Sequence, residues 1–160
     1  MMRKHFLLSA AFLLLSTAVP MPVAAQNIIP QPESISLSRG QFKLNKGLKI
    51  VTNLTGSDFK VLNQYTSEVM NHPLAYAKNP SQQAVFRLIC KGTAQQAAQA
   101  MDSVCLQGYE LEVTPKGITI QSLTPTGLFY GLQTVRQLEK DGKIACVKVK
   151  DTPRFAYRGL

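Results

Sequence analysis

The sequence predicts an α+β domain: a mostly antiparallel sheet with two amphipathic helices on one face. Three observations support this fold class. Apolar and polar residues alternate with a period of two in several short segments, as they do in half-buried strands. Two other segments carry apolar residues at helical spacing. Short turns separate neighbouring strand-like segments, which favours hairpins and therefore antiparallel pairing, with the helices packed on one side.

The first half of the chain contains three stretches with a clear pattern. Residues 35–44 alternate around a central Ser-Arg-Gly turn, which predicts a hairpin, and residues 48–50 continue as a short strand. Residues 55–58 offer helix N-cap side chains. Apolar residues at helical spacing then predict a helix that ends at Asn71-His72-Pro73. Residues 74–83 are expected to form a loop.

The second half contains four further patterned segments: a strand at 84–90, a hairpin at 109–120, a helix at 124–140 and a strand at 144–149. The hairpin is the clearest of the chain, because alternating residues flank the turn Pro115-Lys116-Gly117. Thr124 or Thr126 caps the helix, and Asp141-Gly142 ends it. Residues 91–107 leave two interpretations open, a short helix or a surface excursion.

Residues 1–25 contain the three regions of a secretory signal peptide in the expected order. Arg3 and Lys4 precede an apolar run at residues 6–15, prolines then end any helix, and small residues stand before the expected cut at Ala25. The apolar run is shorter than the ~20 residues that a membrane-spanning helix needs, which argues against an anchor. We therefore expect cleavage after Ala25, export of residues 26–160 and no membrane attachment once the leader is removed.

The charge distribution and the cysteines narrow the function further. Lys and Arg total 18 against 9 acidic residues, but the basic residues are scattered and no aromatic residues are interleaved with them. This pattern is typical of a solvated basic surface, so no nucleic-acid partner is expected. In an oxidising compartment Cys90 and Cys105 are close enough in sequence to form a disulfide. Alternatively, Cys90, Cys105 and Cys146 are buried and unpaired.

The sequence contains no convincing motif of a catalytic, cofactor or metal site. It lacks Gly-x-Ser-x-Gly, a phosphate-binding loop and Cys-x-x-Cys, and His72 is the single histidine after the leader. Gly127 and Gly131 indicate close packing of a helix rather than a glycine-rich ligand loop. Glu110 and Glu112 lie on the polar side of a strand, where ordinary exposed residues are a better explanation than a paired acid and base. These patterns predict no catalytic residue and no metal.

Four segments, in the same order along the chain, resemble one known family. They are Ile29-Pro30-Gln31-Pro32 with Gly40-Gln41-Phe42, the hairpin at 108–120, Gly127-Leu128-Phe129-Tyr130-Gly131-Leu132-Gln133-Thr134, and Asp151-Thr152-Pro153-Arg154-Phe155-Ala156-Tyr157-Arg158-Gly159. Together they resemble the N-terminal domain of glycoside hydrolase family 20, the β-N-acetylhexosaminidases, and the start of the barrel that follows it. The third segment is the most specific of the four.

The resemblance implies three parts: a signal peptide at 1–25, an α+β accessory domain at 26–151 and, at 152–160, the start of a catalytic TIM barrel. A complete barrel needs ~250 residues and does not fit in this chain. The family releases terminal N-acetylglucosamine or N-acetylgalactosamine with retention, through attack by the substrate's own acetamido oxygen. An adjacent Asp-Glu pair serves that reaction, and no such pair occurs here. Neither a metal nor an organic cofactor is expected.

The resemblance also assigns one site residue and the expected partners. Arg158 matches an arginine of the first barrel strand that hydrogen-bonds hydroxyls of the terminal sugar, a contact that requires the rest of the barrel. The partners are thus the barrel in the same chain and glycans that contain N-acetylhexosamine. We expect residues 26–160 to be the inactive N-terminal part of an exported, periplasmic or extracellular, enzyme of a Gram-negative bacterium. A stand-alone carbohydrate-binding or interaction module and a remnant of a truncated gene are the alternatives.

Overall fold

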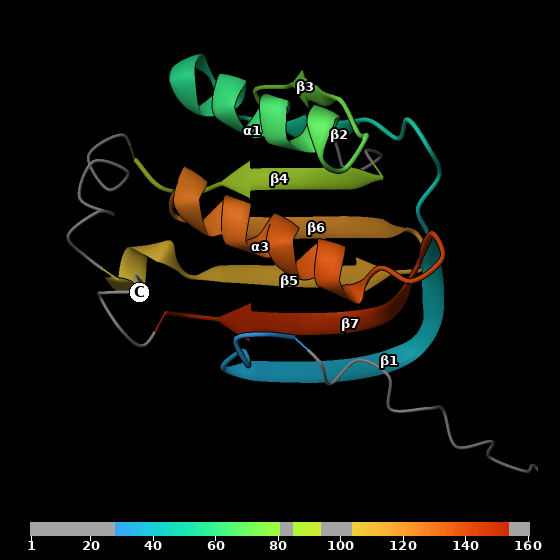
Figure 1. Cartoon of the computed structure of the whole chain (residues 1–160). Coiled ribbons are helices and arrows are strands. Elements are labelled where there is room, and N and C mark those ends of the chain that lie inside the picture. Colours follow the sequence, from blue (N-terminus) through green and yellow to red (C-terminus); the bar gives the residue numbers. More distant parts are fainter. Residues whose placement is uncertain (1–27, 81–84, 94–103, 154–160) are drawn as a thin grey trace, which may run out of the picture.

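The computed structural model describes residues 28–80, 85–93 and 104–153, which form a seven-stranded sheet with two helices (Figure 1). The strands are β1 (Ser34–Lys43), β2 (Ile50–Thr52), β3 (Leu74–Tyr76), β4 (Phe86–Cys90), β5 (Tyr109–Thr114), β6 (Gly117–Ser122) and β7 (Lys143–Asp151). The helices are α1 (Gly56–Glu68) and α3 (Pro125–Leu138), and a 3₁₀ turn covers Val104–Gln107. No helix of these described residues is both long and apolar enough to span a membrane.

The sheet is mixed, with the strand order β1-β7-β5-β6-β4-β2-β3. The pairs β1–β7, β7–β5 and β5–β6 are antiparallel, whereas β6–β4, β4–β2 and β2–β3 are parallel. Parallel neighbours need a crossover connection, and α1 supplies one between β2 and β3. The α+β class is therefore confirmed. The hairpin pattern of the sequence indicated the antiparallel pairs, but it did not indicate the three parallel pairs, which make the sheet mixed.

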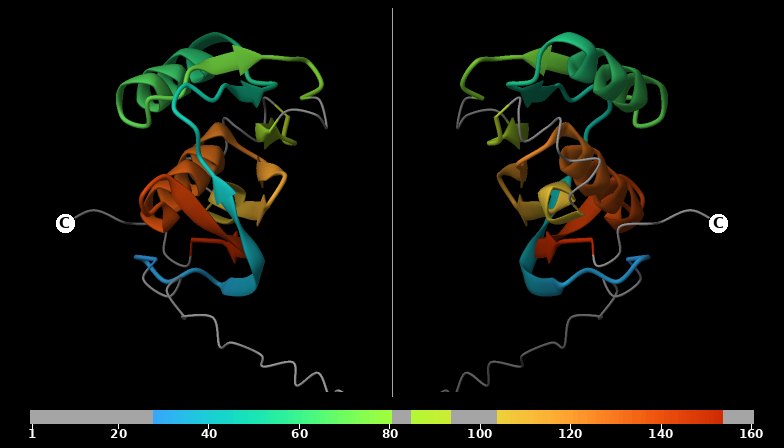
Figure 2. Two further views of the ribbon diagram at one scale, coloured as in Figure 1. Left: turned by 90° about the vertical axis from the view of Figure 1, so that its right-hand side faces the viewer. Right: turned by 90° about the vertical axis from the view of Figure 1, so that its left-hand side faces the viewer.

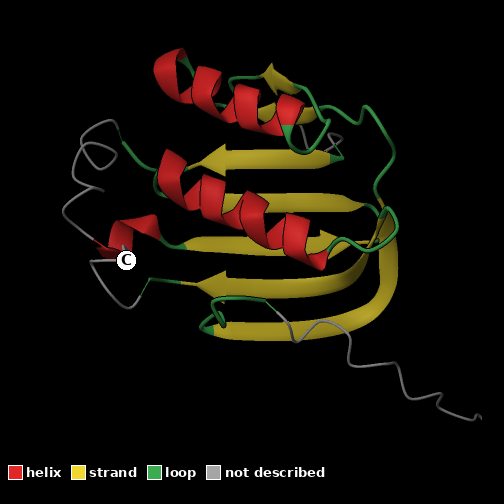
Figure 3. Ribbon diagram, in the orientation of Figure 1, coloured by secondary structure: helices red, strands yellow, loops and turns green. Residues whose placement is uncertain are grey.

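Both helices lie on the same face of the sheet, as the sequence predicts (Figures 2 and 3). The buried apolar side chains form continuous rows beneath them, because residues in register on neighbouring strands point to the same face. One row crosses five strands and consists of Ile50, Phe86, Ile118, Val113 and Val147, each at most 1% exposed. The hydrophobic core thus lies between the sheet and the helix layer.

The most regular sequence patterns give the expected elements. The hairpin β5–β6 alternates buried and exposed residues along β5 and turns at residues 114–117. Of the two candidate caps of α3, Thr124 is the N-cap, and its Oγ1 accepts a hydrogen bond from the backbone N–H of Gly127 at 3.3 Å. Helix α1 also begins and ends within the predicted segment, with Thr55 as its N-cap.

Two local predictions are wrong. Residues 35–44 do not form a hairpin, because β1 runs on to Lys43 and pairs with β7 on both sides of the predicted turn. Leu37 pairs with Val147 and Gln41 with Ala145, so the three residues between Leu37 and Gln41 bulge opposite one residue of β7. Gly40 has a φ of 110°, which its missing side chain allows. The expected loop at 74–83 contains β3, whose three residues are too few to show alternation.

An asparagine side chain extends the pairing of β2 with β4 beyond the last strand residue. The Nδ2 of Asn53 donates to the carbonyl oxygen of Cys90 at 2.8 Å, and the N–H of Cys90 donates to Oδ1 of Asn53 at 2.9 Å. The amide therefore replaces a backbone partner at the end of β4. Nothing in the local sequence pattern indicates this long-range contact.

We expect Asn53→Ala to lower the free energy of unfolding by about 1 to 2 kcal/mol, because it removes the partners of one backbone donor and one acceptor. Urea denaturation followed by circular dichroism measures this loss. Asn45→Ala is the matched control, since Asn45 is exposed. The control is expected to change stability by less than about 0.5 kcal/mol. Equal effects of the two substitutions would contradict the bridging role.

Candidate functional site

The residues predicted from the resemblance lie outside the part of the chain that the structure describes. Arg158 belongs to the undescribed residues 154–160, and Ala25, with the whole predicted leader, belongs to residues 1–27. Both assignments stay predictions. The described residues can still be searched for acids, bases, nucleophiles and metal ligands.

Glu110 and Glu112 lie on the strand face opposite the helices, and each stands opposite a lysine of the neighbouring strand β7. Glu110 is in register with Lys150 and Glu112 with Lys148, and Oε1 of Glu112 lies 2.8 Å from Nζ of Lys148. The hydrogen bond to Glu112 raises the pKa of Lys148. Both partners of this ion pair are largely exposed. The two glutamates are therefore exposed surface charges, and Glu112 forms an ion pair with Lys148, in agreement with the ordinary interpretation of their alternation.

The described cysteines are free thiols in buried or half-buried places. Cys90, at the end of β4, donates its Sγ hydrogen to the carbonyl oxygen of Leu123 at 3.6 Å, and Cys146 lies buried in β7 beneath Gly40. Burial raises the pKa of both thiols, so both favour the protonated, weakly nucleophilic form. Cys146 is buried and unpaired, as one of the two interpretations expects, and Cys90 is unpaired but only half-buried, while the side chain of Cys105 is not among those described.

His72 is the described histidine, and it is a core residue. Its side chain is only 4% exposed, and its Nδ1 has no hydrogen-bond partner. Burial lowers its pKa, so the imidazole is held neutral. Within residues 28–80, 85–93 and 104–153, no three or more His, Cys, Asp or Glu residues gather where a metal could bind.

The glycines of α3 allow the helix to lie directly on the sheet. A Cβ atom at Gly127 would lie 2.1 Å from Oγ of Ser122 and 2.5 Å from the carbonyl oxygen of Gly108. A Cβ atom at Gly131 would lie 2.4 Å from Cγ2 of Ile120. The interpretation of this motif as close packing is confirmed, and the most specific segment of the family resemblance has a structural role in this domain.

Two cavities adjoin the ends of the central strands. One of about 290 Å³ lies where β6 and β7 end, and charged side chains from Lys91, Glu110, Lys150 and Asp151 line it. The other, of about 250 Å³, lies on the polar strand face and shares Glu110 and Lys150 with the first. Positive and negative groups alternate in both. The hydroxyl of Ser122, which lines the first cavity, donates to the carbonyl oxygen of Gly108 at 2.7 Å rather than to a carboxylate.

Two polar contacts that the sequence pattern did not indicate fix α3 to the rest of the domain. Gln137 holds the lead-in segment, because its Oε1 accepts from the N–H of Ile29 at 2.8 Å and its Nε2 donates to the Ile29 carbonyl at 3.0 Å. The hydroxyls of Tyr109 and Thr134 hydrogen-bond each other in the buried layer between β5 and α3. Both contacts join residues far apart in the chain.

The mixed sheet with two helices on one face defines an α+β domain with a structural rather than a catalytic arrangement of its described side chains. A family model described as glycosyl hydrolase family 20, domain 2, matches residues 25–152. The chain therefore belongs to glycosyl hydrolase family 20 and corresponds to the accessory domain of its members. The family predicted from the sequence is confirmed.

Relatives of known name carry the same domain within much longer chains. The chain is 24% identical to β-hexosaminidase subunit A1 of Dictyostelium discoideum over 142 residues, which cover 84% of this chain and 26% of that protein. It is 26% identical to a β-hexosaminidase of Vibrio vulnificus, with coverage of 84% and 14%. The chain thus spans only about a quarter or less of the curated relatives that it matches.

Solved structures share the fold. The N-acetyl-β-hexosaminidase of Streptomyces plicatus superposes with a TM-score of 0.65 at 24% identity, covering 88% of this chain and 28% of that one. The chitobiase of Flavobacterium johnsoniae gives a TM-score of 0.67 at 22% identity, with coverage of 88% and 23%. The β-N-acetylhexosaminidase of Bacteroides fragilis gives 0.58 at 22% identity, with coverage of 81% and 25%. The arrangement of strands and helices is therefore that of known members of the family.

Proposed function

We propose that the chain is the N-terminal, non-catalytic part of an exported β-N-acetylhexosaminidase. The observation that carries this proposal is the match of residues 25–152 to domain 2 of the family. The parent enzyme would release terminal N-acetylglucosamine or N-acetylgalactosamine by the retaining, substrate-assisted mechanism. The names of the curated relatives, both β-hexosaminidases, support this activity.

The proposed partner is a catalytic TIM barrel in the same chain, following Pro153. The relatives that contain this domain are about four times as long as the matched segment or longer, which leaves room for such a barrel. In that arrangement Arg158 would stand in the first barrel strand and donate hydrogen bonds to hydroxyls of the terminal sugar. Glycans that end in N-acetylhexosamine are the proposed substrates.

The proposal that the protein is exported to the periplasm or the exterior of a Gram-negative cell rests only on the signal-peptide pattern of residues 1–25. Charged residues, an apolar run and small residues before Ala25 support secretion. Amino-terminal sequencing of the protein recovered from a periplasmic fraction tests it. A mature chain that begins at Gln26 is expected, and a chain that keeps Met1 would contradict it.

The experiment on the proposed function starts from the coding DNA beyond Leu160. We expect an open reading frame that encodes a barrel with an adjacent Asp-Glu pair. The longer chain is expected to hydrolyse a chromogenic N-acetylglucosaminide, whereas residues 26–160 show no turnover above background. Arg158→Ala in the longer chain is expected to lower kcat/KM by about 10- to 150-fold, the loss of a hydrogen bond from a charged donor.

Two results would contradict the proposal. One is a stop codon directly after Leu160 together with micromolar binding of N-acetylglucosamine without hydrolysis, which would favour a stand-alone binding module. The other is hydrolysis by residues 26–160 alone. Arg158→Lys is the matched control in the longer chain, because it keeps the charge and removes the two-pronged donor.

A further inference from the structure

Five exposed lysines lie at one end of the sheet, although two distant stretches of the sequence supply them. Lys43 ends β1, and Lys46 and Lys49 follow it in the connection to β2. Lys140 and Lys143 flank the turn between α3 and β7. Figure 1 shows both connections at the same end of the molecule, and the left view of Figure 2 faces that end. We call these five residues the basic end.

Backbone hydrogen bonds hold the two stretches of the basic end against each other. The N–H of Leu44 donates to the carbonyl oxygen of Gly142 at 2.8 Å. Lys140 and Lys143 exchange two hydrogen bonds of 2.9 Å across the turn Asp141-Gly142, whose residues take positive φ values of 53° and 70°. The positions of the lysines are therefore set by the fold of the backbone.

The basic end places like charges directly opposite one another. Lys143 stands opposite Lys43 in the pairing of β7 with β1, and it is also bridged to Lys140. Like charges at such positions destabilise a sheet. None of the five lysines forms an ion pair within residues 28–80, 85–93 and 104–153. The basic end thus carries a repulsion that its own neighbours do not relieve.

The other end of β7 shows the ordinary arrangement. There, Lys148 and Lys150 stand opposite Glu112 and Glu110 of β5, and the first of these pairs forms an ion pair. The same strand therefore has lysines that face carboxylates at one end and lysines that face lysines at the other. This contrast sets the basic end apart from a surface whose charges are simply mixed.

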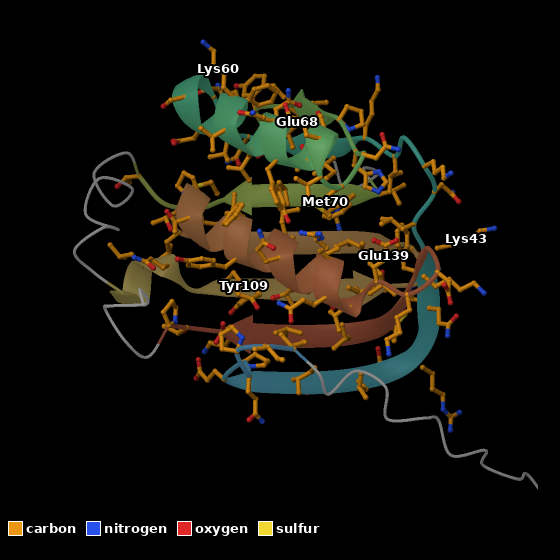
Figure 4. All side chains as sticks on the ribbon, viewed as in Figure 1. Lys43, Lys60, Glu68, Met70, Tyr109 and Glu139 are labelled. Carbon is orange, nitrogen blue, oxygen red and sulfur yellow. The ribbon has the colours of Figure 1, made fainter. Side chains whose placement is uncertain are left out.

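Two carboxylates at the basic end leave it strongly positive. Glu139 and Asp141 belong to the same connection as Lys140, and Figure 4 shows Glu139 at the same end of the molecule as Lys43. Within residues 43–49 and 139–143, five lysines thus stand against two acidic residues. An anion that approaches this end meets a positive surface, because the lysines outnumber the carboxylates.

The open layout favours an extended polyanion over a single small anion. The residues that line the cavities described above include none of the five lysines, so these amines do not converge in one of those hollows. A chain with repeated negative groups contacts several of them at once. Each further contact of the same chain forms at a high effective concentration, which raises the overall affinity.

Two features favour a glycan as this polyanion. Residues 43–49 and 139–143 contain no aromatic side chain on which nucleic-acid bases would stack. The large apolar side chains that are exposed in the described residues all lie outside these two stretches, so none of them serves there as an anchor in a lipid surface. The enzyme proposed above acts on glycans, and an anionic glycan combines that chemistry with the charge of the basic end.

We propose that the basic end binds a glycan chain that carries sulfate or carboxylate groups, with Lys43, Lys140 and Lys143 at the centre of the contact. The choice of a glycan rests on the proposed function, whereas the positive surface does not. In the parent enzyme, this contact would give a polymeric substrate a second attachment besides its terminal sugar. The accessory domain would then favour anionic glycans over neutral ones.

Calorimetric titration of the full chain with defined oligosaccharides tests this proposal. The probes are a sulfated heparin oligosaccharide, an oligogalacturonide that carries carboxylates alone, and a neutral chitin oligosaccharide. At low ionic strength, we expect binding of the heparin probe and none of the neutral one. Binding of the oligogalacturonide as well would show that carboxylates suffice. Affinity is expected to fall at least about tenfold in about 0.5 M NaCl, because salt screens exposed charges.

The double variant Lys43→Gln with Lys143→Gln has a matched control in Lys60→Gln with Lys78→Gln. Both remove two exposed lysine charges, but Lys60 and Lys78 lie outside the basic end, and Figure 4 shows Lys60 far from Lys43. The first variant is expected to lose about tenfold in affinity for the anionic glycan, and the control less than about twofold. Without glycan, the first variant is expected to be at least as stable as the wild type in thermal denaturation, because it removes opposed like charges.

The proposal is overturned if neither anionic oligosaccharide binds, if the neutral one binds as tightly, or if both double variants lose affinity equally. Binding to vesicles of phosphatidylglycerol and phosphatidylethanolamine, without binding of either anionic glycan, would also overturn it and assign the basic end to a lipid surface. A parent enzyme that is active on the chromogenic N-acetylglucosaminide but binds no anionic glycan would contradict this inference alone. Glycan binding with an inactive parent would contradict the proposed function instead.

Discussion

Gly127→Ala is expected to lower the free energy of unfolding by about 2 to 3 kcal/mol, although alanine favours helices by about 1 kcal/mol over glycine. The added Cβ would lie 2.1 Å from Oγ of Ser122 and 2.5 Å from the carbonyl oxygen of Gly108. The serine cannot move freely, because its Oγ donates to that same carbonyl at 2.7 Å. Relief of the overlap therefore requires α3 to move away from β6.

Thermal and urea denaturation of the variant measure this loss. Thr126→Ala is the matched control, since Thr126 is an exposed neighbour on the same helix. The control is expected to keep the stability of the wild type or to gain slightly from the higher helix propensity of alanine. If Gly127→Ala matched the control, the glycine would not be required by packing, and the close approach of α3 to the sheet would need another explanation.

Phe86→Ala is expected to lower the free energy of unfolding by about 3 to 5 kcal/mol, the usual cost of a large cavity in a well-packed core. Phe86 is 0% exposed and stands in register with Ile50 on one side and Ile118 on the other. It thus joins the parallel edge of the sheet to the central strands. Its loss is also expected to weaken the attachment of the segment formed by β2, α1 and β3.

Urea denaturation measures the loss of unfolding free energy in Phe86→Ala, and hydrogen exchange shows which strands lose protection. Phe86→Leu is the control, because it keeps an apolar side chain of reduced volume and is expected to cost less than about 1.5 kcal/mol. Peptides from β2 and β3 are expected to lose more protection than those from β1 and β7 in the alanine variant. A uniform loss across the sheet would contradict the attachment role of Phe86.

The sequence predicts those parts of the fold whose signals are local. The β5–β6 hairpin and α3 combine strong periodicity with their own turn or cap residues, and both form where expected. The parallel pairings could not be predicted in this way, because they join segments separated by a helix. Strand β3 has three residues and exists through its pairing with β2, so no period marks it. In β1, a bulge took the place of the expected turn because β7 offers a partner on both sides of Gly40.

In the candidate site, too, the features with a local sequence signal were predicted and the long-range contacts were not. The packing role of Gly127 and Gly131 followed from their spacing on a helix, and the exposure of Glu110 and Glu112 followed from their alternation. The sequence analysis missed the bridging amide of Asn53, because its partner Cys90 is 37 positions away. The residues next to Asn53 in the sequence do not distinguish it from any other half-exposed asparagine. The role predicted for Arg158 stays a prediction, because this residue lies outside the described part of the chain.

The pairing of β1 with β7 joins the first described strand to the last. In the described sheet β1 has no other neighbour, so it lacks a partner until residues 143–151 have been synthesised. During synthesis, the edge of β1 and one edge of β5 would remain open to pairing with other chains. A contact that spans about 110 residues also makes closure a slow, non-local step. The sheet of this domain is therefore completed only after its final strand has emerged from the ribosome.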